Sequence, residues 1–419
     1  MRISSGYRVI PITKALQRAG NPEKDTVLKY TSALEINGIF LCNEKQKMLM
    51  ISIDALYIGA DFRDMLEVAL RPTLNSEQIF IAASHTHSAP MIDFNKPMLA
   101  VADQQYFNKV LELTKNLAEE LMREENQYPC QYRTVEYQSI AGINRRKFRI
   151  IGASEKRIKF NQTFQIPNFK DFLSQPSHLI EFFNSKFKSI FIWNLPCHPT
   201  SIPDELGHSS GFIGQGRELI RKLYSEDSVI VFLQGASGDI RPPSFNTSYN
   251  LKNFIRRVLF GNWFIDFSVK KYDVWIAKIL EQLSAQITTL KSVELKNISS
   301  FGVIRYTKPY FEFMKTSNLN RKLSIHMIKI NEFLIFGFSG ELLSVFSDYF
   351  YTKYKNKVLL ATCIDDTFGY LPGFDSVGKK GYEVDGFWKY FDIAELKDES
   401  YFRMIEWIFS SAELNEKIK

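Results

Sequence analysis

The sequence lacks the features that mark exported, membrane-spanning and repeat proteins. Its four cysteines lie far apart and form no Cys-x-x-Cys pair, a usage typical of reduced thiols in a cytosolic protein. No apolar run is long enough to span a bilayer, and residues 1–6 lack the apolar core of a signal peptide. Internal repeats and low-complexity tracts are absent as well. We therefore expect a cytoplasmic protein without a transmembrane segment.

The charge balance is also mild for a chain of this length. The 53 basic and 46 acidic residues give a net charge of +7, and the basic residues are scattered rather than gathered into an arm. This distribution, with no nucleic-acid-binding motif, predicts no nucleic-acid partner. It leaves open a peripheral contact with an anionic membrane surface. The 35 phenylalanines are in excess, and some of them could line an apolar pocket for a small-molecule or lipid substrate.

Apolar segments of strand length alternate with amphipathic helices along the chain. This order predicts an α/β fold, a single domain over residues 1–419 with mixed β-sheets flanked by helices and a site in loops at strand ends. Residues 146–190 and 244–270 are predicted as surface excursions. Within the second stretch, residues 253–267 combine bulky apolar side chains with a basic pair, which suits an amphipathic lip, a membrane contact or a core helix.

The strongest local signal is the pair His85 and His87, two of only six histidines. An apolar strand over residues 78–83 leads directly into them. Two histidines two positions apart on extended backbone direct their imidazoles to the same side. This pattern indicates a metal site or an acid–base pair in a loop at a strand end. The alternative is two ordinary loop histidines bonded to backbone.

Two further polar loops also follow apolar strands. The buried strand over residues 189–194 runs into Pro-Cys-His-Pro, which places His198 at a strand end. The strand over residues 228–233 runs into Gly-Ala-Ser-Gly-Asp-Ile-Arg, with Asp239 and Arg241 in a tight loop. Such a loop can bind an oxyanion through its backbone N–H groups, or can be a simple turn.

Three charged residues also have purely structural interpretations. Asp54 follows a buried strand and either supports a metal-bound histidine or caps the next helix. Arg145, in a Gly-Ile-Asn-Arg turn, either reaches a substrate oxygen or is a surface arginine. Ser339 is expected to cap a helix that begins near Glu341, which would make Glu341 a first-turn acid stabilised by the helix dipole.

Short motifs in separate loops follow one another between residues 85 and 383. They are His-Thr-His-Ser-Ala-Pro (85–90), Ala-Gly-Ile-Asn-Arg (141–145), Pro-Cys-His-Pro-Thr (196–200), Gly-Glu (340–341), Gly-Tyr-Leu-Pro (369–372) and Tyr-Glu (382–383). Together they resemble, in residues and in order, the signatures of the neutral/alkaline non-lysosomal ceramidases. Ala89 stands where that family has glycine, and Gly142 stands where it has asparagine.

The resemblance implies a zinc-dependent hydrolase that cleaves an N-acyl amide, with ceramide or a related N-acyl lipid as the leading substrate class. It implies roles for seven residues. The zinc ligands would be His85, His198, Glu341 and Tyr370; His87 would be the acid–base or carbonyl-orienting residue; Arg145 and Tyr382 would reach the substrate. Zinc polarises an amide carbonyl and lowers the pKa of bound water to roughly 7, so the chemistry suits these ligands.

The sequence departs from the family in three respects. Arg241 stands where the family has a serine proposed as nucleophile or water-positioning group, so a serine-acyl route through this position is excluded. Arg241 instead suits recognition of a carboxylate or phosphate, with Asp239 beside it as a second substrate-binding residue. We also expect neither the family's C-terminal β-sandwich domain nor its export signal.

These departures keep two other functions open. One is a deacylase of a polar N-acyl amine, such as an N-acetylated sugar. The other is a non-catalytic binding protein that retains the fold and the metal. Substrate profiling separates the first from a lipid amidase, and zinc-replete protein without turnover would indicate the second.

Overall fold

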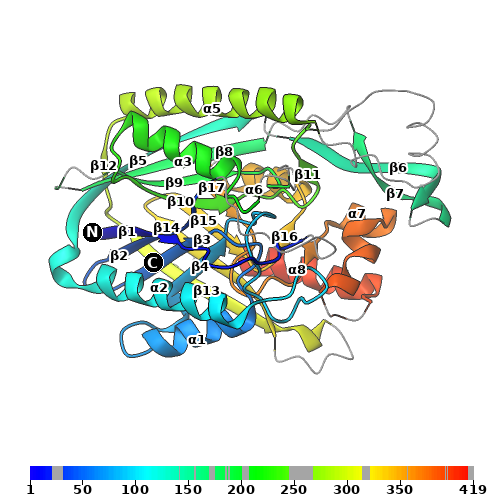
Figure 1. Ribbon diagram of the computed structural model, residues 1–419, viewed down its shortest axis with the longest axis horizontal. Helices are drawn as coiled ribbons and strands as arrows, with labels where there is room; N and C mark the ends of the chain where they lie inside the picture. Colours follow the sequence, from blue (N-terminus) through cyan, green and yellow to red (C-terminus); the bar gives the residue numbers. More distant parts are fainter. Residues whose placement is uncertain are drawn as a thin grey trace.

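The computed structural model describes the chain except for residues 21–31, 141, 155–156, 169–174, 185, 187–188, 201–206, 245–267, 314–320, 356, 392, 394 and 414–419. Two β-sheets lie face to face at the centre, and helices cover their outer faces (Figure 1). The expected α/β class with mixed sheets and flanking helices is confirmed. No helix in the described part of the chain combines the length and apolar character needed to cross a bilayer.

The large sheet has the strand order β10-β9-β8-β5-β1-β2-β3-β4, with β12 beside β5. Neighbouring strands run antiparallel except in the pairs β9/β10 and β3/β4, which are parallel. Its strands are β1 (Arg2–Ile10), β2 (Leu34–Cys42), β3 (Lys47–Ile53), β4 (Ile79–Ala83), β5 (Tyr128–Ser139), β8 (Gln175–Asn184), β9 (Ser189–Leu195), β10 (Val229–Gln234) and β12 (Lys296–Asn297). The two parallel pairs matter for function, because parallel neighbours end at the same edge of a sheet.

The smaller sheet has the order β13-β14-β15-β17, and β15 and β17 run parallel. Its strands are β13 (Phe301–Pro309), β14 (Lys322–Ile330), β15 (Phe333–Phe338) and β17 (Val358–Ala361). Side chains from both sheets meet in one buried cluster that includes Met50, Val231, Ile328 and Leu359. Burial of this apolar surface is the main force that holds the two sheets together.

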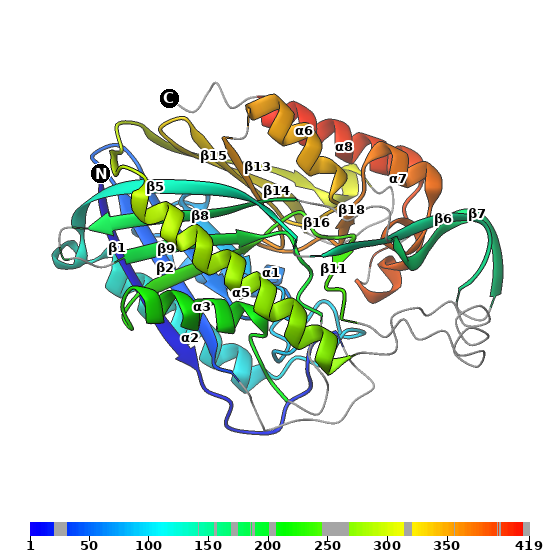
Figure 2. The same cartoon turned by 90° about the horizontal axis from the view of Figure 1, so that it is seen from above.

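Helices bury one apolar face each against the sheets. They are α1 (Ala60–Leu70), α2 (Gln104–Met122), α3 (Phe212–Leu223), α5 (Val269–Ser292), α6 (Val345–Tyr354), α7 (Phe374–Lys379) and α8 (Asp398–Glu413). Helices α3 and α5 pack on β8, β9 and β10 through a cluster centred on Trp193 (Figure 2). In α2 the carboxylate of Asp103 accepts a hydrogen bond from the backbone N–H of Tyr106, which fixes where the helix begins.

Two small sheets complete the fold. One, β11-β6-β7, consists of β11 (Ile240–Arg241), β6 (Ile143–Ser154) and β7 (Arg157–Asn168). The other pairs β16 (Glu341–Leu342) with β18 (Tyr370–Leu371) in parallel. Both small sheets lie at the end of the molecule where the parallel strands finish.

The structure corrects three expectations. The range 146–190 is not all surface excursion, because β8 (Gln175–Asn184) is a buried strand of the large sheet. Glu341 does not lie in a helix, since β16 contains it and α6 begins at Val345. Asp54 neither caps α1 nor supports a histidine: it pairs with Arg217 and accepts the backbone N–H of Glu35. For the predicted excursion 244–270, residues 245–267 lie outside the described part of the chain.

Candidate metal centre and active site

The ends of five strands converge at the site. His85 follows β4, His198 follows β9, and the loop after β10 passes beside them. The backbone joins these ends directly: Ala83 N–H donates to Cys363 O at 2.9 Å, and Thr362 N–H donates to Gln234 O at 2.7 Å. The segments after β15 and β17 thus reach the same edge as those after β4 and β10. This arrangement agrees with the expectation that the site is built from loops at strand ends.

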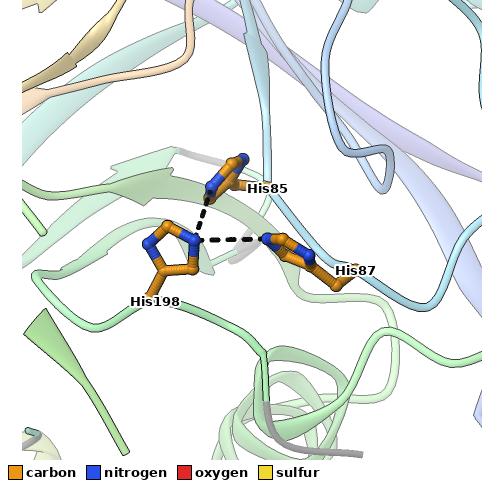
Figure 3. A group of neighbouring side chains, drawn as sticks. All are labelled: His85, His87 and His198. Carbon is orange, nitrogen blue, oxygen red and sulfur yellow. Dashed lines mark hydrogen bonds between the residues drawn. The ribbon is translucent and has the colours of Figure 1, made fainter. Parts of the chain in front are cut away.

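Three imidazoles meet at this edge (Figure 3). Nε2 of His198 lies 3.2 Å from Nε2 of His85 and 3.2 Å from Nε2 of His87. One ring nitrogen from each residue lies within 4.8 Å of the others, a spacing that can hold a metal ion. His85 and His198 are buried, and His87 is partly exposed. The three side chains therefore form one cluster, although His198 lies 111 residues beyond His87.

Backbone carbonyls fix the orientation of two of the rings. Nδ1 of His85 lies 3.1 Å from Leu56 O, and Nδ1 of His198 lies 3.4 Å from Ser237 O. Because a carbonyl only accepts, each Nδ1 carries the proton, and in the neutral ring each Nε2 presents a lone pair. Two lone pairs that face each other at 3.2 Å need a cation between them, either a proton or a metal ion. This is the orientation that metal-binding histidines adopt.

Glu341 completes the cluster. Its Oε2 lies 3.5 Å from Nε2 of His85 and 3.8 Å from Nδ1 of His198. Its Oε1 accepts a hydrogen bond from the Tyr57 hydroxyl at 2.5 Å, whereas Oε2 has no hydrogen-bond partner among the described residues. A buried carboxylate oxygen without a hydrogen-bond partner destabilises the folded protein unless a cation binds it. The parallel pairing of β16 with β18 sets Tyr370 directly beside Glu341.

The electrostatics of the histidines follow from this geometry. Burial alone would lower the pKa of His85, but its contacts with Cys363 and Glu341 outweigh burial and raise it well above its ordinary value. Burial and the neighbouring His85 hold the pKa of His87 and of His198 well below that value. Burial raises the pKa of Glu341, and His85 and Tyr57 more than offset it. The cluster thus attracts positive charge to the space beside His85 and Glu341.

Arg145 connects the cluster to the neighbouring tyrosines. Its Nη2 donates to the Tyr370 hydroxyl at 3.0 Å and to Gly238 O at 2.7 Å, and its Nε donates to Glu383 Oε1 at 2.9 Å. Its guanidinium carbon lies 5.6 Å from the ring centroid of Tyr370 and 5.9 Å from that of Tyr382. Arg145 is therefore a buried residue of the site and not a surface arginine. Its predicted contact with substrate stays a prediction, as does that of Tyr382.

The loop after β10 brings Asp239 and Arg241 to the same region. The Asp239 carboxylate accepts hydrogen bonds from Asn144 Nδ2 at 2.9 Å, from Ser344 N at 2.7 Å and from Ser344 Oγ at 3.0 Å. These bonds hold three segments together, so Asp239 positions the loop; its predicted contact with substrate stays a prediction. Arg241 is close enough to Arg145 and His87 for electrostatic interaction, and burial together with Arg145 lowers its pKa to about 9.

Sequence reasoning missed two residues of the site. Tyr57 donates to Glu341, and Cys363 lies close enough to His85 to raise its pKa. Neither residue belongs to a recognisable motif. Both His85 (φ 64°) and Cys363 (φ 57°) adopt left-handed backbone conformations, which are costly for residues other than glycine and are common at functional sites. A single sequence gives no signal for this conformation.

Comparison with solved structures shows which known fold this chain resembles. The crystal structure of neutral ceramidase from Pseudomonas aeruginosa aligns with a TM-score of 0.70 over 96% of this chain and 73% of that chain, at 12% identity. A ceramidase complexed with C2 aligns with a TM-score of 0.67 over 96% of this chain and 74% of that chain, also at 12% identity. This chain has a neutral ceramidase-like fold. No family model matches the sequence, and no curated protein sequence matches it either.

The neutral ceramidase-like fold extends over nearly the whole chain, so the similarity is not confined to one motif. The resemblance seen in the short motifs is confirmed at the level of the fold. The buried group of His85, His87 and His198 fits a metal site within this fold. Of the four predicted zinc ligands, two belong to this group, and Glu341 and Tyr370 lie beside each other next to it.

Proposed function

We propose that the protein is a zinc-dependent amidohydrolase that cleaves an N-acyl amide bond, with ceramide or a related N-acyl lipid as the leading substrate class. One observation carries the proposal. The Nε2 atoms of His85 and His198 face each other at 3.2 Å beside a buried oxygen of Glu341 that has no hydrogen-bond partner among the described residues. The neutral ceramidase-like fold of the chain supports the choice of an amide as substrate.

Zinc accounts best for this set of donors. Imidazole nitrogen and carboxylate oxygen are its ordinary ligands, and a site with few protein ligands leaves a position for water or substrate. When bound, zinc polarises the amide carbonyl and lowers the pKa of water to roughly 7, which supplies the hydrolytic water. In the proposal His85, His198 and Glu341 hold the ion, with the Tyr370 hydroxyl as a further ligand.

The remaining residues handle protons and substrate position. Because the pKa of His87 is held low, its imidazole is neutral near pH 7 and can accept a proton at Nε2, then return it to the departing amine. Arg145 holds the Tyr370 hydroxyl and keeps positive charge next to the carbonyl oxygen that becomes negative. In the proposal Tyr382, whose ring lies 5.6 Å from that of Tyr370, contacts the substrate. Arg241 excludes a serine nucleophile at its position.

The test is metal content and turnover on the same preparation. Purified protein is loaded with zinc, analysed for bound metal, and assayed for release of fatty acid from N-acylsphingosine and of acetate from N-acetylated sugars. The proposal expects bound zinc, long-chain fatty acid release, and loss of both in His85→Ala. Protein that takes up no zinc would end the proposal, and zinc-replete protein inactive on a broad amide panel would indicate a binding protein instead.

A second candidate function is hydrolysis of an amide whose amine portion carries a carboxylate or phosphate. The specific observation is Arg241, a second arginine close to Arg145 and His87 in the site. An arginine fork binds such anions with two parallel hydrogen bonds. Arg241→Gln would then raise KM about tenfold for an anionic N-acyl amine and leave an uncharged amide unaffected. An equal effect on both substrates would exclude recognition of the anion by Arg241.

A further inference from the structure

The hairpin of β6 and β7 projects beyond the body of the molecule (Figures 1 and 2). Its inner end belongs to the candidate active site, because Arg145 lies at the start of β6 and contacts Tyr370. The middle of the hairpin touches the segment around Tyr382, since Gly381 packs against Thr163 of β7, the residue that pairs with Phe148. The hairpin is therefore a continuous structure that leads from the site outward to solvent.

Large apolar side chains are exposed along this hairpin. The exposed fractions are 48% for Phe148, 70% for Ile150 and 63% for Phe160. In the described part of the chain, the other phenylalanine with comparable exposure is Phe374 in α7, the helix that packs beside β7. Exposed aromatic surface is thus concentrated at one place, although phenylalanine is abundant throughout the protein. Such a concentration marks an interaction site.

The apolar side chains lie on both faces of the hairpin. Phe148 and Ile150 are two positions apart in β6, so they point to the same face. Phe160 pairs with Ile151 across the hairpin, so it points to the opposite face. A flat protein partner would bury one face and leave the other exposed. A hairpin that is apolar on both sides suits insertion into a layer that surrounds it.

The charged residues of the two strands are of one sign, and Glu155 lies in the connection between the strands. The two strands contain six basic residues, four in β6 and two in β7, and no acidic residue. Arg145 and Arg146 pair with Glu383 at the inner end. Lys147, Arg149 and Lys159 lie further out, partly exposed, among the apolar side chains. Basic residues that flank apolar ones favour the surface of a bilayer that contains anionic lipids.

We propose that the outer part of the β6–β7 hairpin docks on an anionic bilayer surface, with Phe148, Ile150 and Phe160 in the headgroup–acyl boundary. Insertion stays shallow, because β7 is an edge strand whose free backbone groups must remain hydrated. The purpose of the docking rests on the proposed function: it brings the candidate active site, from which the hairpin extends, to the surface where a lipid amide is found. The docking itself is independent of catalysis.

Vesicle sedimentation tests the proposal directly. The full chain is mixed with vesicles of phosphatidylcholine, alone or with phosphatidylserine, and the bound fraction is measured. Wild-type protein should bind the anionic vesicles, and the variant F148S/I150S/F160S should bind them about tenfold more weakly. The matched control is V68S/V101S/V269S, which removes three side chains that are 60%, 68% and 54% exposed elsewhere on the surface. The control should bind like wild type.

Three results would overturn the proposal. They are wild-type protein that does not bind anionic vesicles, a hairpin variant that binds as well as wild type, and equal losses in the two triple variants. Sedimentation velocity tests self-association. A wild-type dimer that the hairpin variant converts to monomer would mean that a second copy of the chain, and not a bilayer, covers the hairpin. Each of these outcomes is obtained with folded protein, because all the substituted side chains are at the surface.

The same variants separate docking from the proposed function. If the protein is an amidase of lipids, the hairpin variant should lose activity on an amide presented in vesicles and keep activity on a soluble short-chain amide. If the protein hydrolyses no amide but binds anionic vesicles through the hairpin, docking stands and the proposed function fails. If the protein hydrolyses amides but binds no vesicles, the proposed function stands and docking fails.

Discussion

Two buried groups of charged and titratable side chains lie close to the strand ends, and they differ in how their charges are matched. The first is the histidine site, formed by His85, His87, His198 and Glu341. The second is an arginine–carboxylate cluster, formed by Glu35, Asp54, Arg217 and Arg221. In the second, Arg221 donates to both oxygens of Glu35 at 2.6 and 2.8 Å, and Arg217 pairs with Asp54. Two carboxylates thus face two guanidinium groups.

The histidine site has no such internal balance. In both groups one carboxylate oxygen has no hydrogen-bond partner among the described residues, Oε2 of Glu341 and Oδ1 of Asp54, but in the histidine site imidazole lone pairs also face one another. Both groups are largely buried, so burial does not distinguish a site from a structural cluster. What distinguishes them is whether the chain itself supplies the opposite charge. A group that lacks it is prepared for a ligand from outside, whereas a balanced group stabilises the fold.

The largest expected effect is the loss of metal and activity on truncation of His198. His198→Ala removes the ring that contacts both other imidazoles, so bound zinc should fall to background and kcat/KM should fall at least about a thousandfold. Zinc is measured by mass spectrometry on gel-filtered protein. The control is Glu35→Gln, which alters the balanced cluster and should keep its zinc. A variant pair that retains equal zinc would contradict the assignment of the histidine site.

Glu35→Gln should act on stability and should do so in a pH-dependent way. Burial raises the pKa of Glu35, but Arg217 and Arg221 outweigh it and lower the pKa to about 2. A depressed pKa means that the ionised carboxylate stabilises the fold above its unfolded-state pKa, and that this stability is lost as pH falls towards 2. Urea unfolding at pH 7 should show a loss of about 3 kcal/mol in the variant.

The same comparison at low pH is the control. At about pH 3 the wild-type carboxylate has lost part of its advantage, so the difference between wild type and Glu35→Gln should be smaller than at pH 7. A difference that is constant over this range would show that Glu35 stabilises the fold through packing alone. Activity per folded molecule should be unchanged at pH 7, since Glu35 belongs to the balanced cluster.

Arg145 and Arg146 bind the same carboxylate, so a role in catalysis and a purely structural role can be compared at one position. Both pair with Glu383, but Arg145 also donates to the Tyr370 hydroxyl and to Gly238 O. Lysine cannot reproduce this fork, so Arg145→Lys should lower kcat about a hundredfold. Arg146→Lys, the matched variant, should change kcat by less than about threefold. Steady-state kinetics on a soluble amide measure both, and equal effects would reduce Arg145 to a structural ion pair.

The strand ends and the three histidines of the cluster can be predicted because apolar strand patterns and rare residue types are visible in a sequence. The fold class follows from alternating strands and helices. By contrast, β8 cannot be found in this way, because its neighbours in the chain have no clean period and its place in the large sheet depends on pairing with β5 and β9. Such long-range pairing leaves no local signal.

Two residues of the site show the same effect of distant partners. Glu341 follows a strand and a serine, a pattern typical of a helix start, yet its backbone N–H donates to Gly369 O at 2.7 Å in a two-strand pairing. Asp239 lies in a glycine-rich loop, a setting that favours a substrate contact, but Asn144 and Ser344, from distant segments, occupy its oxygens. In both cases the partner that decides the role is far away in the sequence.

The smallest expected effect concerns the support of Glu341 by Tyr57. The Tyr57 hydroxyl donates to Oε1 at 2.5 Å and so orients the carboxylate with Oε2 towards the imidazoles. Tyr57→Phe should weaken zinc affinity about tenfold, because groups that orient metal ligands typically contribute at this level. A competition titration against a zinc chelator measures the change. Tyr401→Phe is the matched control, since its buried hydroxyl donates to Val384 O at 2.6 Å away from the histidine site. Equal affinities in the two variants would mean that the position of Glu341 is set by the β16–β18 pairing alone.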